Sequence, residues 1–234
     1  MIRIDNLTVQ FGGVKALNDV CVHLVGPVVG IIGPNGAGKT TLLNAFSGFV
    51  PTAAGSRISM DDVDLLALTP PARARWGVRR SFQAEQVVDD LSVAENVQVI
   101  LDSSALSRQE RRAALERALR FVDLEDQAGR PGGSLNAFER RLVELARAVA
   151  GRPRVVLLDE PGGGLSGGEV DMLREVIGRI HPEFGACTLL IDHDVELITA
   201  ACVETMVLDF GTLIAHGPTA QVLADPQVRN AYLG

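Results

Sequence analysis

Lysine is almost absent from this 234-residue chain, in which twenty of the twenty-two basic residues are arginine. The two lysines are Lys15 and Lys39. The two cations are not equivalent, because the planar guanidinium forms forked hydrogen bonds whereas the compact ammonium acts as a point charge. A composition that replaces lysine almost everywhere but keeps one at position 39 therefore points to a special requirement there.

Cysteine is also scarce, and Cys21, Cys187 and Cys202 lack the spacing of a metal-binding motif. They lie in apolar or mixed runs, so we expect buried thiols in a reducing cytosol rather than a disulfide framework. No stretch approaches ~18 consecutive apolar residues, and the N-terminus lacks the pattern of a signal peptide. The sequence predicts a cytoplasmic protein that reaches a membrane only through a partner.

Excess positive charge is lacking as well. The net charge is −7, so nucleic-acid binding would need a local basic patch that works against the overall field. Two arginine-rich stretches, 73–80 and 108–120, alternate with apolar residues or glutamate. We interpret both as solvated helix faces and expect no nucleic-acid partner. The length predicts one large domain with a full core.

Residues 33–41 match the pattern Gly-x-x-x-x-Gly-Lys-[Ser/Thr] of a phosphate-binding loop. They follow the β-branched run 28–32 and precede a helical pattern, which is the context that gives the motif this meaning. Glycines let backbone N–H groups approach β- and γ-phosphate oxygens, and the new helix directs its positive dipole end at them. Lys39 supplies a charge and Thr40 a hydroxyl for Mg²⁺. The predicted nucleotide-binding residues are Gly33, Pro34, Asn35, Gly36, Ala37, Gly38, Lys39, Thr40 and Thr41. The alternative is a glycine turn that merely feeds a helix.

An acidic pair follows a second apolar run, residues 155–158. Four consecutive apolar residues are typical of a parallel strand covered on both faces, and ligands of α/β sheets gather at the carboxyl ends of such strands. Asp159 is the expected second holder of the Mg²⁺ shell, and Glu160 is expected to orient and polarise the attacking water. As unrelated residues, Asp-Glu-Pro after a strand would indicate a helix start.

Helical patterns occupy much of the rest of the chain. A capping box at Ser92 and Glu95 predicts a helix through about Leu101, and apolar residues at helical spacing in 107–122 and 136–151 predict two more. A further helix is expected from Gly168 and should stop at Pro182, because proline cannot continue the backbone hydrogen bonding of a helix.

Together these motifs resemble the nucleotide-binding subunit of an ATP-binding cassette (ABC) transporter over essentially the whole chain. The resemblance implies an α/β P-loop NTPase with a RecA-like core and a small antiparallel β subdomain. It implies a helical subdomain inserted at roughly 88–140 within a single domain, 1–234. It also implies that Phe11 stacks on adenine, that Gln83 senses Mg²⁺ and the attacking water, and that His193 contacts the γ-phosphate. From the residues alone, Phe11 also fits a core aromatic, Gln83 a solvated loop amide and His193 a capping or core histidine.

Four segments are similar to the subgroup that imports branched-chain and other hydrophobic amino acids, namely residues 11–17, 190–194, 207–211 and 225–234. Cassettes for lipopolysaccharide or urea share parts of them. The similarity implies an ATPase on the inner face of the cell membrane that hydrolyses Mg·ATP and drives permease subunits. It would dimerise with the same or a second ATPase subunit and serve a solute-binding protein indirectly. A soluble non-transport cassette protein and a weakly hydrolysing regulatory partner remain as alternatives.

The family's signature loop, normally Leu-Ser-Gly-Gly-Gln, aligns with Leu135–Glu139, where Asn136 replaces the serine and Ala137 and Phe138 replace the glycines. In the family this loop closes over ATP held by the other subunit, so side chains there should weaken that contact. Ser166 likewise stands where aspartate is usual. Because the residues offered to this chain's own ATP are all present, we predict a heterodimer with two unequal sites. The alternative is that Asn136 and a shifted backbone replace the usual contacts.

Overall fold

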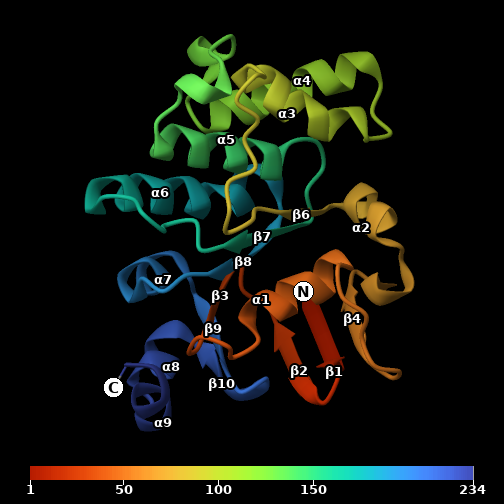
Figure 1. Cartoon of the computed structure of the whole chain (residues 1–234), viewed down its shortest axis with the longest axis vertical. Helices are drawn as coiled ribbons and strands as arrows, with labels where there is room; N and C mark the ends of the chain where they lie inside the picture. The colour runs from red at the N-terminus through yellow and green to blue at the C-terminus, as the bar shows by residue number, and fades with distance from the viewer. Residues whose placement is uncertain (234) are drawn as a thin grey trace.

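The computed structural model describes residues 1–233 and contains two β-sheets together with a group of helices (Figure 1). One sheet is antiparallel, with strand order β2-β1-β4-β5. The other has the order β10-β9-β3-β8-β7-β6; its strands from β9 to β6 run parallel and β10 is antiparallel to β9. The strands are β1 (Ile2–Phe11), β2 (Val14–Leu24), β3 (Val28–Ile32), β4 (Arg57–Met60), β5 (Val63–Asp64), β6 (Val78–Arg80), β7 (Val155–Asp159), β8 (Cys187–Ile191), β9 (Glu204–Asp209) and β10 (Thr212–Pro218).

Three helices, α3, α4 and α5, form the upper part of the molecule in Figure 1, above α6 and the six-stranded sheet. Along the described chain, no helix is both long enough and apolar enough to cross a bilayer. The helices are α1 (Lys39–Ser47), α2 (Pro70–Trp76), α3 (Val93–Asp102), α4 (Arg108–Phe121), α5 (Ala137–Val149), α6 (Gly167–Phe184), α7 (Val195–Ala201), α8 (Thr219–Ala224) and α9 (Pro226–Val228), followed by a π-helical turn (Arg229–Leu233).

Two cores meet at the six-stranded sheet. All five residues of β7 are buried, and the four apolar ones alternate between the two cores. Val155 and Leu157 pack in the core that α1 shares with the antiparallel sheet, whereas Val156 and Leu158 pack in the core under α3, α5 and α6. Because a one-residue slip would move every side chain of β7 into the opposite core, the position of its carboxyl end is well determined.

The predicted α/β architecture with an antiparallel β part and a helical part is confirmed. The helices predicted at 92–101, 107–122 and 136–151 correspond to α3, α4 and α5. α3 and α4 lie wholly within residues 88–140, whereas α5 crosses the limit at residue 140. Of the tail segment 225–234, Gly234 lies outside the described residues.

α6 continues past Pro182 to Phe184, so the prediction that it stops at Pro182 is wrong. Proline removes one backbone donor there. The last turn is nevertheless held by packing, because the Phe184 ring meets Phe121 edge to face with the centroids 5.0 Å apart. The helix then closes at Gly185, which has φ 71° and donates its N–H to the His181 carbonyl at 2.8 Å. Side-chain burial outweighs the loss of one hydrogen bond near the helix end.

The interpretation of residues 73–80 as a solvated face is also wrong. Arg73 is buried and donates to the carbonyl oxygens of Ala45 (2.5 Å) and Phe46 (3.1 Å), near the end of α1. Arg80 is buried as well, in an ion pair described below. Sequence alternation cannot reveal such roles, because the long arginine side chain satisfies acceptors on other elements. In α4, by contrast, the arginines are exposed or half-buried, as predicted.

Cys187 and Cys202 are buried free thiols, as predicted, but Cys21 is exposed. Cys21 lies on the solvent face of β2, whose side chains alternate between buried and exposed. Burial raises the pKa of Cys187 to about 11 and that of Cys202 to about 12. Both buried thiols therefore stay protonated at neutral pH.

Candidate nucleotide-binding and hydrolysis site

The glycine-rich loop joins β3 to α1, and two of its glycines are required by close neighbours. A Cβ on Gly33, which has φ 145°, would lie 2.0 Å from the Leu208 carbonyl oxygen. A Cβ on Gly38, with φ 102°, would lie 2.5 Å from the Ala16 carbonyl oxygen. Gly36 has φ 79° and open space around it. The loop is thus held against β9 and β2, while its middle stays accessible.

The N-terminus of α1 carries no side-chain cap and no acid in its first turn. The leading N–H groups of a helix have no intrahelical acceptors, so those of Lys39, Thr40 and Thr41 are available to an anion. The Lys39 ammonium donates to the carbonyl oxygens of Gly33 (2.6 Å) and Pro34 (2.9 Å). Burial lowers the pKa of Lys39, and the charges of two nearby acids oppose that shift. A buried cation and unpaired N–H groups together form a site for phosphate.

Asp159, the last residue of β7, lies across from this loop. Its Oδ1 atom is 3.5 Å from the Thr40 hydroxyl oxygen. Its Oδ2 atom forms an ion pair with Arg80 at 3.1 Å, with the two side chains 3% and 7% exposed. Burial raises the pKa of Asp159, and the charge of Arg80 acts in the opposite direction. Thr40 and Asp159, both predicted to bind metal, are therefore brought together, and Arg80 is an unpredicted partner.

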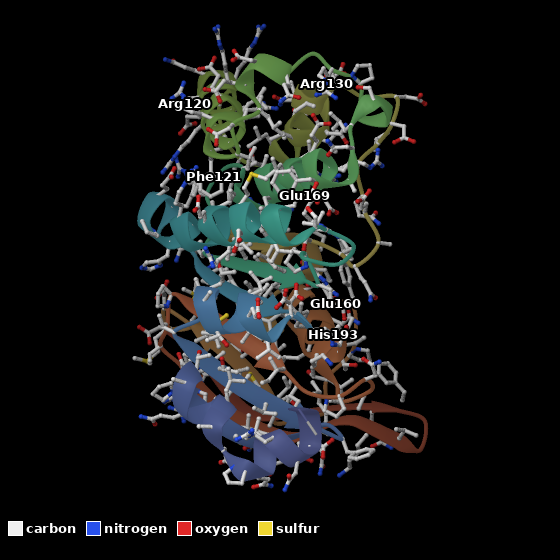
Figure 2. All side chains as sticks on the ribbon, turned by 90° about the vertical axis from the view of Figure 1, so that its left-hand side faces the viewer. Arg120, Phe121, Arg130, Glu160, Glu169 and His193 are labelled. Carbon is white, nitrogen blue, oxygen red and sulfur yellow. The ribbon has the colours of Figure 1, made fainter. Side chains whose placement is uncertain are left out.

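Glu160 lies between the other two predicted catalytic residues. Its Oε2 atom accepts a hydrogen bond from Gln83 Nε2 at 2.7 Å, and its Oε1 atom lies 2.7 Å from His193 Nε2. Figure 2 shows Glu160 and His193 next to each other at mid-height in the molecule. Gln83, Glu160 and His193 follow β6, β7 and β8, which are adjacent in the sheet, so strand order explains why three distant positions meet.

Glu160 also departs from ordinary backbone geometry, with φ 52°. A non-glycine residue in the left-handed region is uncommon and costs about 1–3 kcal/mol. The turn directs the Asp159 side chain to Thr40 and Arg80, and the Glu160 side chain to Gln83 and His193. The two consecutive acids therefore have different contacts: Asp159 contacts a hydroxyl and a guanidinium group, whereas Glu160 contacts an amide and an imidazole.

The structure decides between the alternative interpretations of Phe11, Gln83 and His193. Phe11 ends β1 with 51% of its surface exposed, so it is not a core aromatic. His193 is 46% exposed at its side chain and contacts Glu160, so it is not a core histidine. Gln83 bonds to Glu160 rather than to solvent alone. The N-cap of α7 is Asp194 and not the neighbouring histidine.

The altered loop before α5 is capped by its own side chains. Asn136 Oδ1 accepts the N–H of Glu139 at 2.8 Å, and Glu139 Oε2 accepts the N–H of Asn136 at 2.9 Å. Arg130 binds both carboxylate oxygens of Glu139, at 2.7 and 3.1 Å. This hydrogen bonding by Arg130 is the main reason that the pKa of Glu139 is lowered. Ser166 is engaged in the same way at α6, where Glu169 Oε2 accepts its N–H at 2.7 Å.

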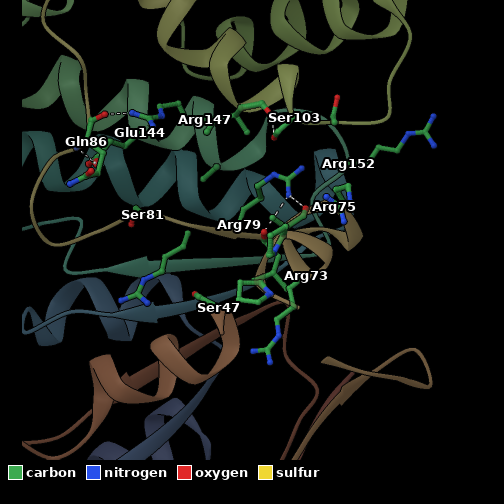
Figure 3. Close-up of a pocket in the computed structure, with 18 of the residues that line it drawn as sticks. Ser47, Arg73, Arg75, Arg79, Ser81, Gln86, Ser103, Glu144, Arg147 and Arg152 are labelled. Carbon is green, nitrogen blue, oxygen red and sulfur yellow. Dashed lines mark hydrogen bonds between the residues drawn. The ribbon is translucent and has the colours of Figure 1, made fainter. Parts of the chain in front are cut away.

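A hollow of about 840 Å³ lies between α2, β6 and the helices α3 and α5 (Figure 3). Phe49, Phe82 and Ile100 contribute apolar surface to it. Among the described residues, four arginines in its wall have no carboxylate partner within ion-pair distance, namely Arg73, Arg75, Arg79 and Arg147. The hollow therefore combines apolar walls with an excess of positive charge.

Comparisons with known proteins agree with this geometry. Residues 20–163 match the family described as "ABC transporter", and residues 212–234 match "Branched-chain amino acid ATP-binding cassette transporter". The chain is 35% identical over 251 residues to the high-affinity branched-chain amino acid transport ATP-binding protein BraF of Pseudomonas aeruginosa, covering 100% of this chain and 98% of that protein. It is 37% identical over 238 residues to the lipopolysaccharide export system ATP-binding protein LptB of Escherichia coli, covering 100% and 97%.

A solved structure is similar over the same length. The crystal structure of the ADP conformation of MJ1267, an ATP-binding cassette of an ABC transporter, superposes with a TM-score of 0.88 at 26% identity. The superposition covers 100% of this chain and 98% of that one.

Proposed function

The chain belongs to the ABC transporter family of ATP-binding proteins, and from this premise we propose that it powers the import of branched-chain or other hydrophobic amino acids. As a member of the family it is an ATPase that binds ATP, dimerises and works with transmembrane permease subunits. The match of residues 212–234 to the branched-chain amino acid cassettes supports the choice of solute. The similarity to LptB makes lipopolysaccharide export the second candidate.

One observation carries the assignment of hydrolysis: the carboxylate of Glu160 is held between Gln83 and His193, across from the uncapped end of α1. In our proposal Lys39 and the N–H groups of the loop bind the phosphates, and Phe11 stacks on adenine through its exposed ring. Glu160 accepts a hydrogen bond from the attacking water, and Gln83 orients the same water. His193 contacts the γ-phosphate and limits the motion of Glu160.

Thr40, Asp159 and Gln83 are the proposed holders of Mg²⁺. The donor set fits this ion, because a hydroxyl and a carboxylate oxygen 3.5 Å apart are hard oxygen ligands. Within residues 1–233 no three His, Cys, Asp or Glu side chains are grouped to hold a metal ion. The remaining ligands would therefore be phosphate oxygens and water, as Mg²⁺ prefers. When bound, Mg²⁺ neutralises charge on the β- and γ-phosphates.

The positively charged hollow is the proposed docking site of a permease. A permease segment with apolar side chains and a carboxylate would match Phe49 and Ile100 on the walls. Its carboxylate would match the guanidinium groups of Arg79 and Arg147, which bond to backbone carbonyls but to no carboxylate among the described residues. The wall of the hollow includes residues next to Gln83 and residues of the helices at 88–140. We interpret these helices as an insertion within a single domain. In this arrangement the subunit works at the inner face of the cell membrane, and a solute-binding protein acts through the permease.

The pairing that we propose is a heterodimer with two unequal ATP sites. In the family the signature loop of one subunit faces the ATP of the other. The N–H of Asn136 is already bonded to Glu139, and that carboxylate would repel a γ-phosphate. The site built on this chain's own loop would therefore use an intact signature from a different partner.

Single-turnover hydrolysis of radiolabelled ATP by the reconstituted transporter tests the catalytic proposal. We expect Glu160→Gln to slow hydrolysis about 10²- to 10⁴-fold, as for the loss of a general base, with ATP still bound. Uptake of labelled leucine by cells that carry or lack the gene tests the solute. Unchanged hydrolysis in the variant contradicts the first assignment, and loss of lipopolysaccharide export with intact leucine uptake would favour the second candidate.

A further inference from the structure

Arg80 forms the most deeply buried charge contact at the hydrolysis site. It is the last residue of β6, and its side chain is 7% exposed. One terminal nitrogen, Nη2, donates to Asp159 Oδ2 at 3.1 Å, and the other, Nη1, donates to Asn44 Oδ1 at 2.6 Å. Arg80 therefore connects α1, which follows the phosphate loop, with the acid at the end of β7.

This contact determines which oxygen of Asp159 is available. Arg80 occupies Oδ2, so Oδ1 is the atom that faces the Thr40 hydroxyl at 3.5 Å. A buried carboxylate without a cation would be strongly unfavourable, because neither water nor charge would compensate its desolvation. Outer ligands of this type orient metal-binding carboxylates in other proteins, and their loss typically weakens metal binding about 10–100-fold.

The same guanidinium group lies in the wall of the 840 Å³ hollow. Its carbon Cζ is 4.9 Å from the centre of the Phe82 ring and 5.8 Å from that of the Phe49 ring, and the two ring centres are 5.9 Å apart. Both phenylalanines line the hollow, and Phe49 is 58% exposed. The Arg80 Nε atom is buried with no hydrogen-bond partner among the described residues. One side chain is thus shared by the hollow and the acid.

We propose that Arg80 is a positioning residue that holds Asp159 Oδ1 toward the magnesium side and transmits occupation of the hollow to that acid. The proposal rests on the proposed function, since it assumes a nucleotide beside Thr40. A segment that enters the hollow displaces the Phe49 ring and offers an acceptor to Arg80 Nε. The guanidinium group then moves, and Asp159 moves with it, because their contact is a direct hydrogen bond.

The first test measures metal binding rather than turnover. The full chain is loaded with a non-hydrolysable ATP analogue, and its affinity for Mn²⁺ is read from the electron paramagnetic resonance signal of the free ion. We expect Arg80→Gln to weaken Mn²⁺ binding about 10–100-fold and Arg80→Lys to weaken it less. Binding of the analogue in EDTA should change less than about twofold, because the phosphate loop is intact.

Arg141→Gln is the matched control. Arg141 forms an equally buried ion pair with Glu144 at 2.6 Å, with side chains 6% and 3% exposed, but it has no contact with Asp159. Both substitutions should lower the melting temperature, since each leaves a buried carboxylate unpaired. Only the Arg80 variant should change Mn²⁺ affinity. Equal Mn²⁺ affinities in wild type and Arg80→Gln would overturn the proposal, as would an equal loss in the Arg141 variant.

A double-mutant cycle tests the link to the hollow. We expect Phe49→Ala to weaken Mn²⁺ binding about threefold in the wild-type chain and to have no further effect in Arg80→Gln, because contacting residues are not additive. Ile100→Ala, on another part of the wall, should leave Mn²⁺ affinity unchanged. Additive effects of Phe49→Ala and Arg80→Gln would contradict transmission through Arg80. If the wild-type chain binds neither nucleotide nor Mn²⁺, the proposed function itself fails, which is a different result.

Discussion

The N-termini of α1 and α5 both carry the positive end of a helix dipole, but their side chains differ in how far they leave that end open to an anion. α1 begins at Gly38 with no side-chain cap and no acid in its first turn. α5 begins at Asn136 with a complete capping box, an acid at Glu139 and an arginine bound to that acid. A helix dipole attracts phosphate only where the leading N–H groups are still unpaired. The leading N–H groups of α1 are free, whereas α5 has bonded that of Glu139 to the Asn136 side chain and carries a carboxylate in its first turn.

The largest effect should follow from removing the cation at the α1 end. We expect Lys39→Ala to weaken ATP binding about 100-fold, since a hydrogen bond to a charged group contributes up to ~3 kcal/mol. Isothermal titration calorimetry measures it. Lys15→Ala is the matched control, because Lys15 is the other lysine of the chain, is exposed and bonds to Asn18. An equal loss of ATP affinity in the two variants would show that the cation at the α1 end has no special role.

A graft of the usual signature onto α5 should remove the carboxylate and the Cβ atoms that separate this helix end from an anion, while the cap remains. The variant combines Asn136→Ser, Ala137→Gly, Phe138→Gly and Glu139→Gln. We expect steady-state ATP turnover of the chain alone to rise at least tenfold, because one added donor to a developing oxyanion contributes about 10²–10³ in rate. Equal ATP turnover by the unmodified chain and by the graft would show that the native loop does not slow hydrolysis.

The converse change gives α1 the acid that α5 carries. Thr41 is the third residue of α1, the position that Glu139 occupies in α5. We expect Thr41→Glu to weaken ATP binding about tenfold, since a charge at a helix end contributes up to ~2 kcal/mol. Thr41→Gln serves as the uncharged control in the same calorimetric titration. Similar affinities for the two variants would mean that charge at this position is unimportant.

The cap of α5 should contribute to stability but not to nucleotide binding. We expect Asn136→Ala to cost about 1 kcal/mol, which lowers the melting temperature by roughly 2–4 °C in a chain of this size. Asn136→Ser should keep most of the cap. Differential scanning calorimetry of the two variants provides the measurement, and a shift in ATP affinity for Asn136→Ala would argue against an independent α5 end.

The smallest predicted effect is a pH dependence at α5. Arg130 lowers the pKa of Glu139 below its ordinary value of about 4.3. The stabilisation is therefore complete above pH ~5 and is lost as the pH falls through the lowered value. We expect Glu139→Gln to be less stable than wild type at pH 7, and the difference to be smaller at about pH 3. Urea unfolding at both pH values measures this, and a constant difference would exclude ionisation of Glu139 as the cause.

Local patterns predicted the helices and the loop well, because their signals lie within a few neighbouring residues. The capping box of α3 and the apolar spacing of α4 and α5 placed these helices to within about two residues. The error at Pro182 arose where a local rule competed with long-range packing, the contact between Phe184 and Phe121. The buried role of Arg73 was missed for the same reason, since its acceptors belong to α1, far away in the sequence.

The residues of the site also divide into those that a local motif identified and one that no local motif identified. Lys39, Thr40, Asp159 and Glu160 were identified because each belongs to a short motif at a strand end. The partnership of Arg80 with Asp159 had no such signal, although Arg80 stands three residues before Gln83, a site that the family resemblance did mark. A buried ion pair across two strands depends on sheet order, which no run of neighbouring residues encodes.

The sequence by itself determined the chemistry that is present: a glycine loop with one retained lysine, an acid pair after a buried strand, and a signature loop that carries side chains in place of glycines. Only the tertiary structure decided how these parts are used. The order β8-β7-β6 brings Gln83, Glu160 and His193 together, and the fold leaves α1 uncapped while Arg130 and Glu139 close α5. The physical reason is that a residue's chemistry is local, whereas the unpaired hydrogen-bonding groups that give it a role depend on neighbours supplied by distant segments.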